Sequence, residues 1–140
     1  MSNLSIHTAA YTPADSKQTP GYAFTLRSDT VYLKCSNKFK QKEPAHLNEL
    51  KAITNALYLV NSRNIKASKI IVVTSSKYAA KALKRKPIGD LETLVNSLLN
   101  ETLRKTKALL TVKLVKYGTP EYNKPINNFV RELAKQASEK

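Results

Sequence analysis

The sequence predicts an α/β fold in which helices flank a five-stranded mixed sheet. Three stretches near the N-terminus alternate apolar and polar residues, as half-buried strands do. Segments with helical spacing of apolar residues then alternate with two further predicted strands, a continuous apolar run at 70–73 and an alternating stretch at 110–115. The predicted order, βββαβααβα, contains no internal repeat and no Gly/Ser-rich linker. We therefore expect a single domain over residues 1–140, with a core from about residue 4 to residue 138.

The first three predicted strands cover residues 4–11, 22–27 and 31–35. The turn formers Ser28 and Asp29 separate the second from the third, which predicts a hairpin. The stretch between the first two strands is rich in turn-forming residues and is expected to be a loop.

A helix is expected over residues 46–61, because apolar residues recur there every three or four positions after Pro44. Residues 70–73 are continuously apolar and β-branched, which is typical of a strand buried on both faces. Helical spacing resumes at 78–84. Since the strand leads directly into this helix, the hydroxyl residues after it should lie at the carboxyl edge of the sheet, where α/β folds place their sites. These residues are Thr74, Ser75 and Ser76.

The remaining elements are a helix, a strand and a helix. Asp90 is expected to cap the first helix, whose apolar stripe includes Leu94 and ends at Leu103. The fifth strand follows at 110–115. Pro125 then opens the last helix, because proline is well tolerated at a first helical position.

The charge of the chain points to a polyanionic partner. Lysine and arginine number 24 and acidic residues only 10, for a net charge of +14. No basic helix carries an aromatic face, and no apolar run approaches the length of a membrane span, so a membrane partner is not expected. The N-terminus lacks the pattern of an export signal, and Cys35 is the only cysteine. We expect an intracellular protein, cytoplasmic or nuclear.

Three fragments resemble motifs of the ribonuclease H-like superfamily, in the order in which that family carries them. Residues 47–50, LNEL, are similar to its helix segment with a catalytic glutamate. Residues 72–78, VVTSSKY, resemble its strand-end Thr-Asp-Ser-x-Tyr motif, and 123–127, NKPIN, resemble the Asn-Glu-x-Ala-Asp segment that opens its last helix. The predicted element order is also that of the family. The short stretch before Asp90 is more similar to retroviral and retroelement domains than to the longer cellular enzymes.

The resemblance implies a site in which four carboxylates hold two Mg²⁺ ions that hydrolyse RNA paired with DNA. Only Glu49 is retained among the four. The other three positions fall on neutral residues: Ala9, Ser75 and Asn127. Neutral side chains do not supply the negative charge that two hard cations need. Asp15 and Glu121, in predicted loops, are the acids from which a rearranged site would have to be completed.

The leading hypothesis is a catalytically inactive nucleic-acid-binding domain that needs no metal or other cofactor. Hydroxyl and amide groups at Thr74, Ser75, Ser76 and Asn127 are candidate donors to phosphate. Basic residues that the family topology places around a nucleic-acid track are Lys38, Lys40, Lys42, Lys81, Lys84, Arg85 and Lys86. Phe39 either stacks on a base or sugar or anchors its connector in the core. The favoured partner is an RNA/DNA hybrid or double-stranded RNA, contacted through its backbone.

Two other functions stay open on the sequence. One is an active, Mg²⁺-dependent ribonuclease with a rearranged site around Glu49. The other is a protein-interaction scaffold in a viral, retroelement or ribonucleoprotein assembly. Glu49 itself has a further interpretation, as a solvated or ion-paired helix glutamate.

Overall fold

The computed structural model describes residues 3–13, 18–40 and 44–140. Within them, five strands form one sheet in the order β3-β2-β1-β4-β5. The strands are β1 (Asn3–Tyr11), β2 (Gly21–Arg27), β3 (Tyr32–Lys38), β4 (Lys69–Thr74) and β5 (Leu109–Leu114). β1 to β3 pair antiparallel, whereas β4 pairs parallel to both β1 and β5. The mixed sheet expected from the sequence is confirmed.

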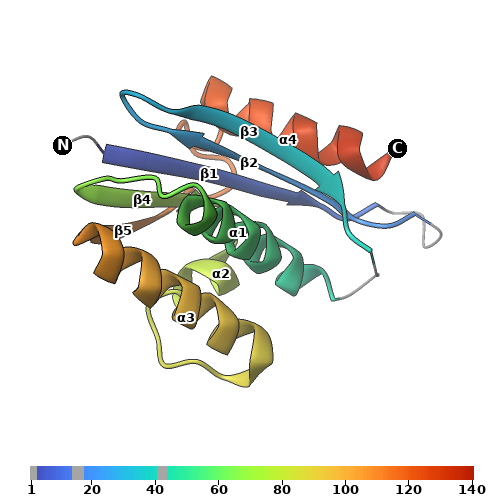
Figure 1. Cartoon of the computed structure of the whole chain (residues 1–140). Helices are drawn as coiled ribbons and strands as arrows, with labels where there is room; N and C mark the ends of the chain where they lie inside the picture. The colour runs from blue at the N-terminus through green and yellow to red at the C-terminus, as the bar shows by residue number, and fades with distance from the viewer. Residues whose placement is uncertain (1–2, 14–17, 41–43) are drawn as a thin grey trace.

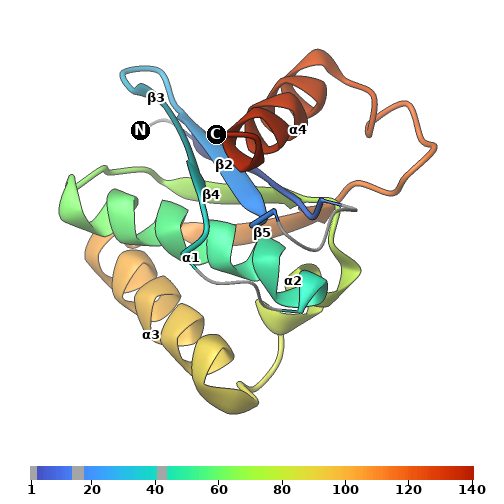
Figure 2. The ribbon, with the colours of Figure 1, turned by 90° about the vertical axis from the view of Figure 1, so that its right-hand side faces the viewer.

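Helices cover both faces of this sheet. They are α1 (Ala45–Ser62), α2 (Lys77–Ala82), α3 (Gly89–Thr106) and α4 (Pro125–Ser138). α4 lies across β1, β2 and β3 on one face, while α1 lies on the opposite face and α3 packs against α1 (Figures 1 and 2). The carboxyl ends of β1 and β4 are thus left at an edge between the α1 layer and the α4 layer.

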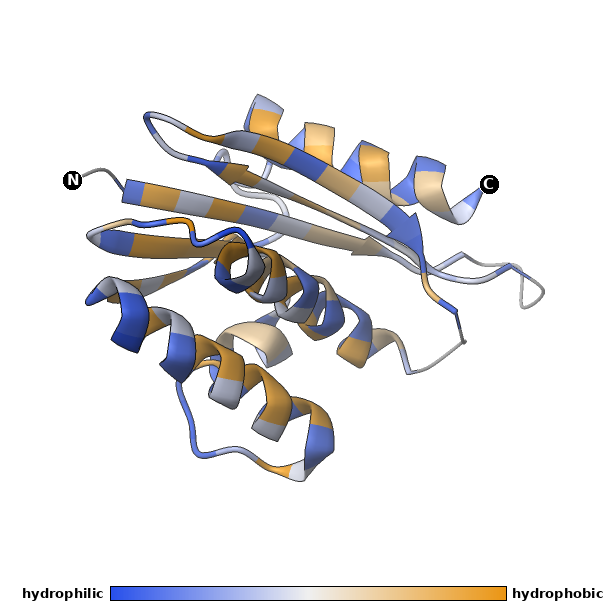
Figure 3. Cartoon of the chain, viewed as in Figure 1, coloured by the Kyte–Doolittle hydropathy of each residue, from blue (hydrophilic) through white to orange (hydrophobic). Residues whose placement is uncertain are grey.

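The apolar residues divide into two cores, one for each face. The larger lies between the sheet and α1 and includes Leu4, Ile6, Leu50 and Ile53, none of which is exposed. The smaller lies under α4 and is built from Ala9, Ala23, Val130 and Ala134. Hydrophobic residues alternate with hydrophilic ones along α3 and α4, as the helical spacing predicted (Figure 3).

Small residues let α4 approach β2 closely. A Cβ built on Gly21 would lie only 2.6 Å from the backbone nitrogen of Ser138, and it would also collide with the carbonyl oxygen of Ala134. Glycine is therefore needed at this position for lack of space, because the sheet and the helix backbone meet there.

Several expected boundaries differ in the structure. β3 continues to Lys38 because its last residue pairs with Gly21. Asp90 was expected to be a cap and is not, since α3 begins at Gly89 and Asp90 lies within its first turn. Leu94 belongs to the expected apolar stripe but is 51% exposed.

In the part of the chain that the structure describes, none of the helices has the length and apolarity to cross a membrane.

Candidate nucleic-acid interface

A small depression opens where the carboxyl ends of β1 and β4 approach the first turn of α4. His7 pairs with Val73 in the parallel ladder, so the residues that follow on the two strands lie side by side. The depression is lined by Thr8, Val73, Thr74, Ser75, Val115, Asn127 and Arg131. Its enclosed volume is about 10 Å³, room for roughly one water molecule. A larger ligand would therefore lie across its mouth.

Ser75 and Asn127 meet in this depression, as the family resemblance implied, although they are far apart in the sequence. Ser75 is exposed directly after β4. Asn127 is half-buried, and its amide nitrogen donates to the carbonyl of Glu121 at 2.7 Å. That bond ties the start of α4 to the loop that precedes it.

Glu49, in the first turns of α1, bonds two residues that line the depression, Thr8 and Thr74, but its own carboxylate is buried in the protein. It is 7% exposed. Its Oε1 accepts hydrogen bonds from the hydroxyls of Thr8 at 2.6 Å and Thr74 at 3.0 Å. Burial raises the pKa of this carboxyl, against the opposing effect of the two hydroxyls and the Ala10 backbone. Glu49 is thus buried, and it has no ion-pair partner among the residues that the structure describes, contrary to the interpretation of it as a solvated or ion-paired helix glutamate.

Ala9, which the spacing had assigned to the family's first aspartate position, does not face Glu49 but lies on the other face of the sheet. Its side chain is 3% exposed and packs with Ala23, Val130 and Ala134 beneath α4. Neighbouring residues of a strand point to opposite faces, so Thr8 and not Ala9 meets Glu49.

Two of the three hydroxyls expected to donate to phosphate are engaged within the protein. Thr74 is 1% exposed, and its hydroxyl donates to Glu49 while accepting from the backbone nitrogen of Ser76 at 3.1 Å. The Ser76 hydroxyl caps α2 by accepting from the nitrogen of Ala79 at 3.1 Å. Ser75 is the exposed hydroxyl of the three.

Arg131 is a residue of the depression that the sequence analysis missed. It lies four residues after Asn127 on α4, and this spacing places both on one helix face. Its Nη2 donates to the carbonyl of Tyr122 at 2.8 Å and also to the side chain of Asn128. Its guanidinium lies 3.7 Å from the centre of the Tyr122 ring. The i, i+4 spacing from Asn127 was the signal that could have identified it.

Expected basic residues lie at the end of β3 and on and after α2, at the sheet edge that carries the depression. Lys38 pairs with Gly21, which pairs with Tyr11, so the end of β3 shares a sheet edge with the end of β1, about 10 Å away at ordinary strand spacing. Lys40 is exposed just beyond it. Exposed lysines also follow β4, on α2 and after it: Lys81, Lys84 and Lys86. Lys42 lies outside the described residues.

Phe39 occupies the second of its two expected roles, as an anchor. Its ring is 9% exposed and packs against Tyr22, with centroids 4.8 Å apart. The Lys51 ammonium lies 5.5 Å from the ring centre. The ring is therefore not open for a base to stack on it.

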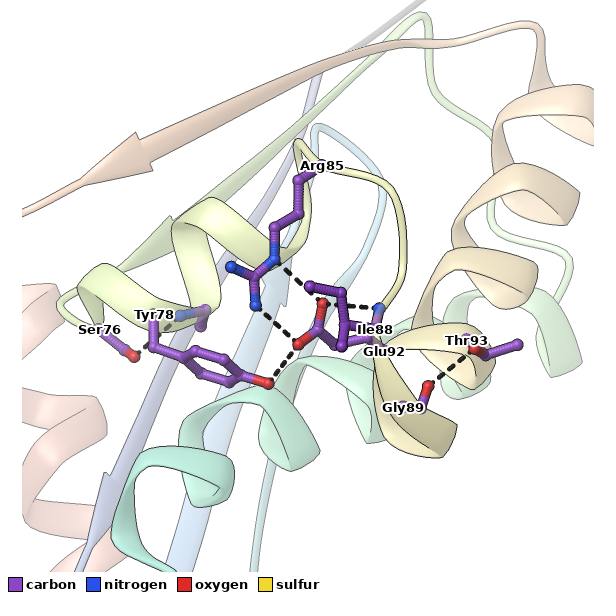
Figure 4. A network of polar contacts seen from close by, with 8 residues as sticks. Ser76, Tyr78, Arg85, Ile88, Gly89, Glu92 and Thr93 are labelled. Atoms are coloured by element: carbon purple, nitrogen blue, oxygen red, sulfur yellow. Dashed lines mark hydrogen bonds and ion pairs between the residues drawn. The ribbon is translucent and has the colours of Figure 1, made fainter.

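Arg85 is held by a buried carboxylate on α3, Glu92 (Figure 4). Glu92 accepts two bonds from the guanidinium, at 3.2 and 2.8 Å, and one from the Tyr78 hydroxyl at 2.7 Å. The backbone nitrogen of Ile88 donates a fourth at 3.3 Å. The hydrogen bonds from Arg85, followed by that from Tyr78, lower the pKa of Glu92 to about 2. This network fixes the basic turn between α2 and α3.

The described residues around the depression do not fit a pair of hard cations. Magnesium sites use several oxygen ligands, carboxylates above all. Glu49 contributes the one carboxylate near the depression, and it is engaged by hydroxyls. Glu121 is paired with Lys113 at 3.3 Å and Lys124 at 2.9 Å, which lowers its pKa. Among the described residues no three His, Cys, Asp or Glu side chains form a group that could hold a metal, and Asp15 lies outside them.

Comparison with proteins of known structure identifies the fold of this chain. No family model and no curated protein matches the sequence. Solved structures do match: the N-terminal RNase H domain of a Mycobacterium tuberculosis protein has a TM-score of 0.73 at 12% identity and covers 99% of this chain and 95% of its own.

LC11-RNase H1, isolated from compost by a metagenomic approach and solved in complex with an RNA/DNA hybrid, has a TM-score of 0.70 at 12% identity, covering 97% and 96%. The RNase H domain of prototype foamy virus has a TM-score of 0.61 at 15% identity, covering 99% and 94%. Bacterial, metagenomic and viral domains thus share the strand order and helix placement seen here, and this chain has the ribonuclease H-like fold.

Proposed function

We propose that this protein binds the backbone of a nucleic-acid duplex, preferably an RNA/DNA hybrid or double-stranded RNA, without metal-dependent hydrolysis. The observation that carries the proposal is the lining of the depression at the ends of β1 and β4. An exposed hydroxyl, Ser75, and a guanidinium, Arg131, lie there beside the amide of Asn127. Such groups suit a phosphate, since hydroxyls and guanidinium groups donate hydrogen bonds to it and the guanidinium adds positive charge.

The state of Glu49 supports the absence of hydrolysis. Its carboxylate is buried and already accepts bonds from Thr8 and Thr74. Recruiting it to a metal would require a carboxylate that is buried and held by two hydroxyls to be opened to the solvent edge of the site. Ser75 and Asn127, at two of the remaining family positions, are neutral and bring no charge to replace the missing carboxylates.

The distribution of positive charge supports a duplex as the partner. Exposed lysines lie just beyond β3 and along α2, at the sheet edge that carries the depression, in a chain of net charge +14. Several phosphates along one duplex could thus be contacted at once. A-form duplexes are recognised by shape, phosphates and 2′-hydroxyls more than by sequence. The structure of LC11-RNase H1, which has a similar fold, was solved in complex with an RNA/DNA hybrid, and this supports the same class of ligand here.

The test uses a fluorescently labelled RNA/DNA hybrid, with polarisation for binding and denaturing gels for cleavage, in EDTA, in Mg²⁺ and in Mn²⁺. We expect binding in EDTA that weakens steeply between 50 and 200 mM salt, because neutralising each phosphate releases counterions. No cleavage is expected with either metal. Metal-dependent cleavage that is lost in Glu49→Gln would overturn the proposal in favour of an active ribonuclease. If the protein shows no binding and no cleavage, the remaining hypothesis is the protein-interaction scaffold.

A matched pair of variants locates the binding surface. Arg131→Ala removes a positive charge from the depression, and Arg104→Ala removes the same charge from α3, in the opposite layer of the molecule. We expect Arg131→Ala to weaken hybrid binding about tenfold and to lower the salt dependence by about one phosphate, whereas Arg104→Ala has little effect. Arg131→Lys keeps the charge and serves as a check, because Arg131 also contacts Tyr122. Equal losses from the two alanine variants would place the nucleic acid elsewhere.

A further inference from the structure

An exposed aromatic side chain lies beside the depression and is not used by the fold. Tyr117, in the loop between β5 and α4, is 87% exposed, the highest value among the large hydrophobic side chains in the described part of the chain. An aromatic ring so open to water contributes little to the core. Tyr117 is therefore a candidate contact for a ligand.

The loop holds Tyr117 in a defined place. The backbone nitrogen of Val115 donates to the carbonyl of Thr74 at 2.9 Å, which joins the start of the loop to the edge of β4. The Thr119 hydroxyl then donates to the carbonyl of Lys116 at 2.6 Å, closing a turn around Tyr117. Hydrogen bonds within the protein thus constrain the backbone on both sides of Tyr117, which limits the entropy lost on binding.

Tyr117 is linked to the depression through one other ring. Its ring centre lies 5.2 Å from that of Tyr122, with the two planes 69° apart. Tyr122 in turn carries the guanidinium of Arg131 at 3.7 Å. A near-perpendicular contact covers little of an aromatic face. The exposed ring and the cation of the depression are thus separated by a single aromatic side chain.

We propose that Tyr117 stacks on an unpaired nucleobase whose strand places a phosphate at Arg131 and Ser75. The ligand would be a duplex that ends in, or carries, at least one unpaired nucleotide at this edge of the sheet. This inference rests on the proposed binding of a nucleic-acid backbone and specifies which structure is bound best. A flat aromatic surface next to a phosphate-binding cation is the combination used by proteins that bind unpaired strands.

The chemistry favours a base over other flat or apolar groups. The ring carries a hydroxyl, and the exposed Lys116 precedes it in the loop, so a purely apolar partner would meet polar and charged groups. A base within a duplex has both faces covered by its neighbours and is not available. An unpaired base has an open face and brings its phosphate with it.

The experiment compares a blunt RNA/DNA hybrid with the same hybrid bearing one unpaired 2-aminopurine nucleotide. Binding is measured by polarisation, and stacking by the quenching of 2-aminopurine fluorescence. We expect the overhang to improve affinity by about 5- to 150-fold, the range that stacking on one aromatic side chain provides. Tyr117→Ala should bring the ratio of the two affinities close to one and abolish the quenching, whereas Tyr117→Phe should retain both.

Tyr58→Ala is the matched control. Tyr58 is 66% exposed on α1, nine residues and therefore about 13 Å further along that helix than Glu49. It should leave the ratio and the quenching unchanged. If the wild-type protein binds the blunt hybrid but shows no preference for the overhang, or keeps the preference in Tyr117→Ala, the stacking inference alone is refuted. If it binds neither hybrid, the proposed function fails and this inference with it.

Discussion

Replacing Glu92 by glutamine should destabilise the protein in a way that depends on pH. The carboxylate of Glu92 accepts two bonds from Arg85, one from Tyr78 and one from the backbone of Ile88, and its side chain is only 4% exposed. Glutamine has nearly the same shape but no charge, and its amide group would point a donor at the donors of Arg85. Paired charges and hydrogen bonds are therefore lost without leaving a cavity.

The magnitude follows from the pKa of Glu92. Holding this pKa at about 2, from an ordinary value of 4.5, corresponds to roughly 3 kcal/mol of preference for the charged form. Arg85 is 40% exposed, so solvent screens the pair and lowers the expected loss to about 1–2 kcal/mol. With a urea dependence of about 2 kcal/mol per molar, the unfolding midpoint at pH 7 should fall by about 0.5–1 M.

The sign of the pH dependence is fixed by the direction of the shift. Because the folded-state pKa is lowered, the stabilisation is present above about pH 4.5 and is lost as pH falls toward about 2. Urea unfolding followed by circular dichroism at pH 7, 5 and 3 should show the difference between wild type and Glu92→Gln shrinking at pH 3. Glu132→Gln, an exposed position on α4, controls for the change in net charge. Equal midpoints at pH 7, or a difference as large at pH 3 as at pH 7, would refute the reasoning.

Three further substitutions probe the sheet and the buried carboxylate. Gly21→Ala should lower the free energy of unfolding by about 1–3 kcal/mol, measured in urea, because the added methyl group meets the backbone of Ala134 and Ser138. Glu49→Gln should leave the stability at pH 7 unchanged or raise it, because burial raises the pKa of Glu49 in the folded protein. The stabilisation that comes from protonated Glu49 is fully present below about pH 4.5 and is lost as the pH rises through the folded-state pKa. A urea series from pH 4 to 8 should therefore show wild type losing stability relative to the variant, and parallel curves would count against it. Thr8→Val should be destabilising by about 1–3 kcal/mol at pH 7, and by less in the Glu49→Gln background, which a double-mutant cycle measures.

Local patterns were sufficient to predict which elements form. The β-branched run at 70–73 became β4, and the helical spacing from Leu47 to Val60 became the buried face of α1. Such periodicities depend on which side of an element faces the core, and each segment records that by itself. The ends of elements were less predictable. β3 extends to Lys38 through pairing with Gly21 on another strand, and α3 begins before Asp90.

The candidate site also contains residues that the sequence predicted and residues that it did not. The order of the motifs predicted the fold and placed Ser75 and Asn127 near each other, and both line the depression. The same reasoning did not identify Arg131 or Tyr117. Nor did it show that Phe39 is buried, because burial depends on Tyr22 and Lys51, which lie elsewhere in the sequence.

By itself, the sequence determined the element order and the excess of positive charge, and it predicted neutral residues at three of the family's four carboxylate positions. Only the tertiary structure decided how the remaining groups are used. The bonds of Glu49 to Thr8 and Thr74 join residues 41 and 25 positions apart. The contact between Arg131 and Tyr122 joins a helix to the loop before it. These partners are set by how strands and helices pack, and side-chain chemistry alone does not reveal whether a group faces the solvent or is already satisfied within the protein.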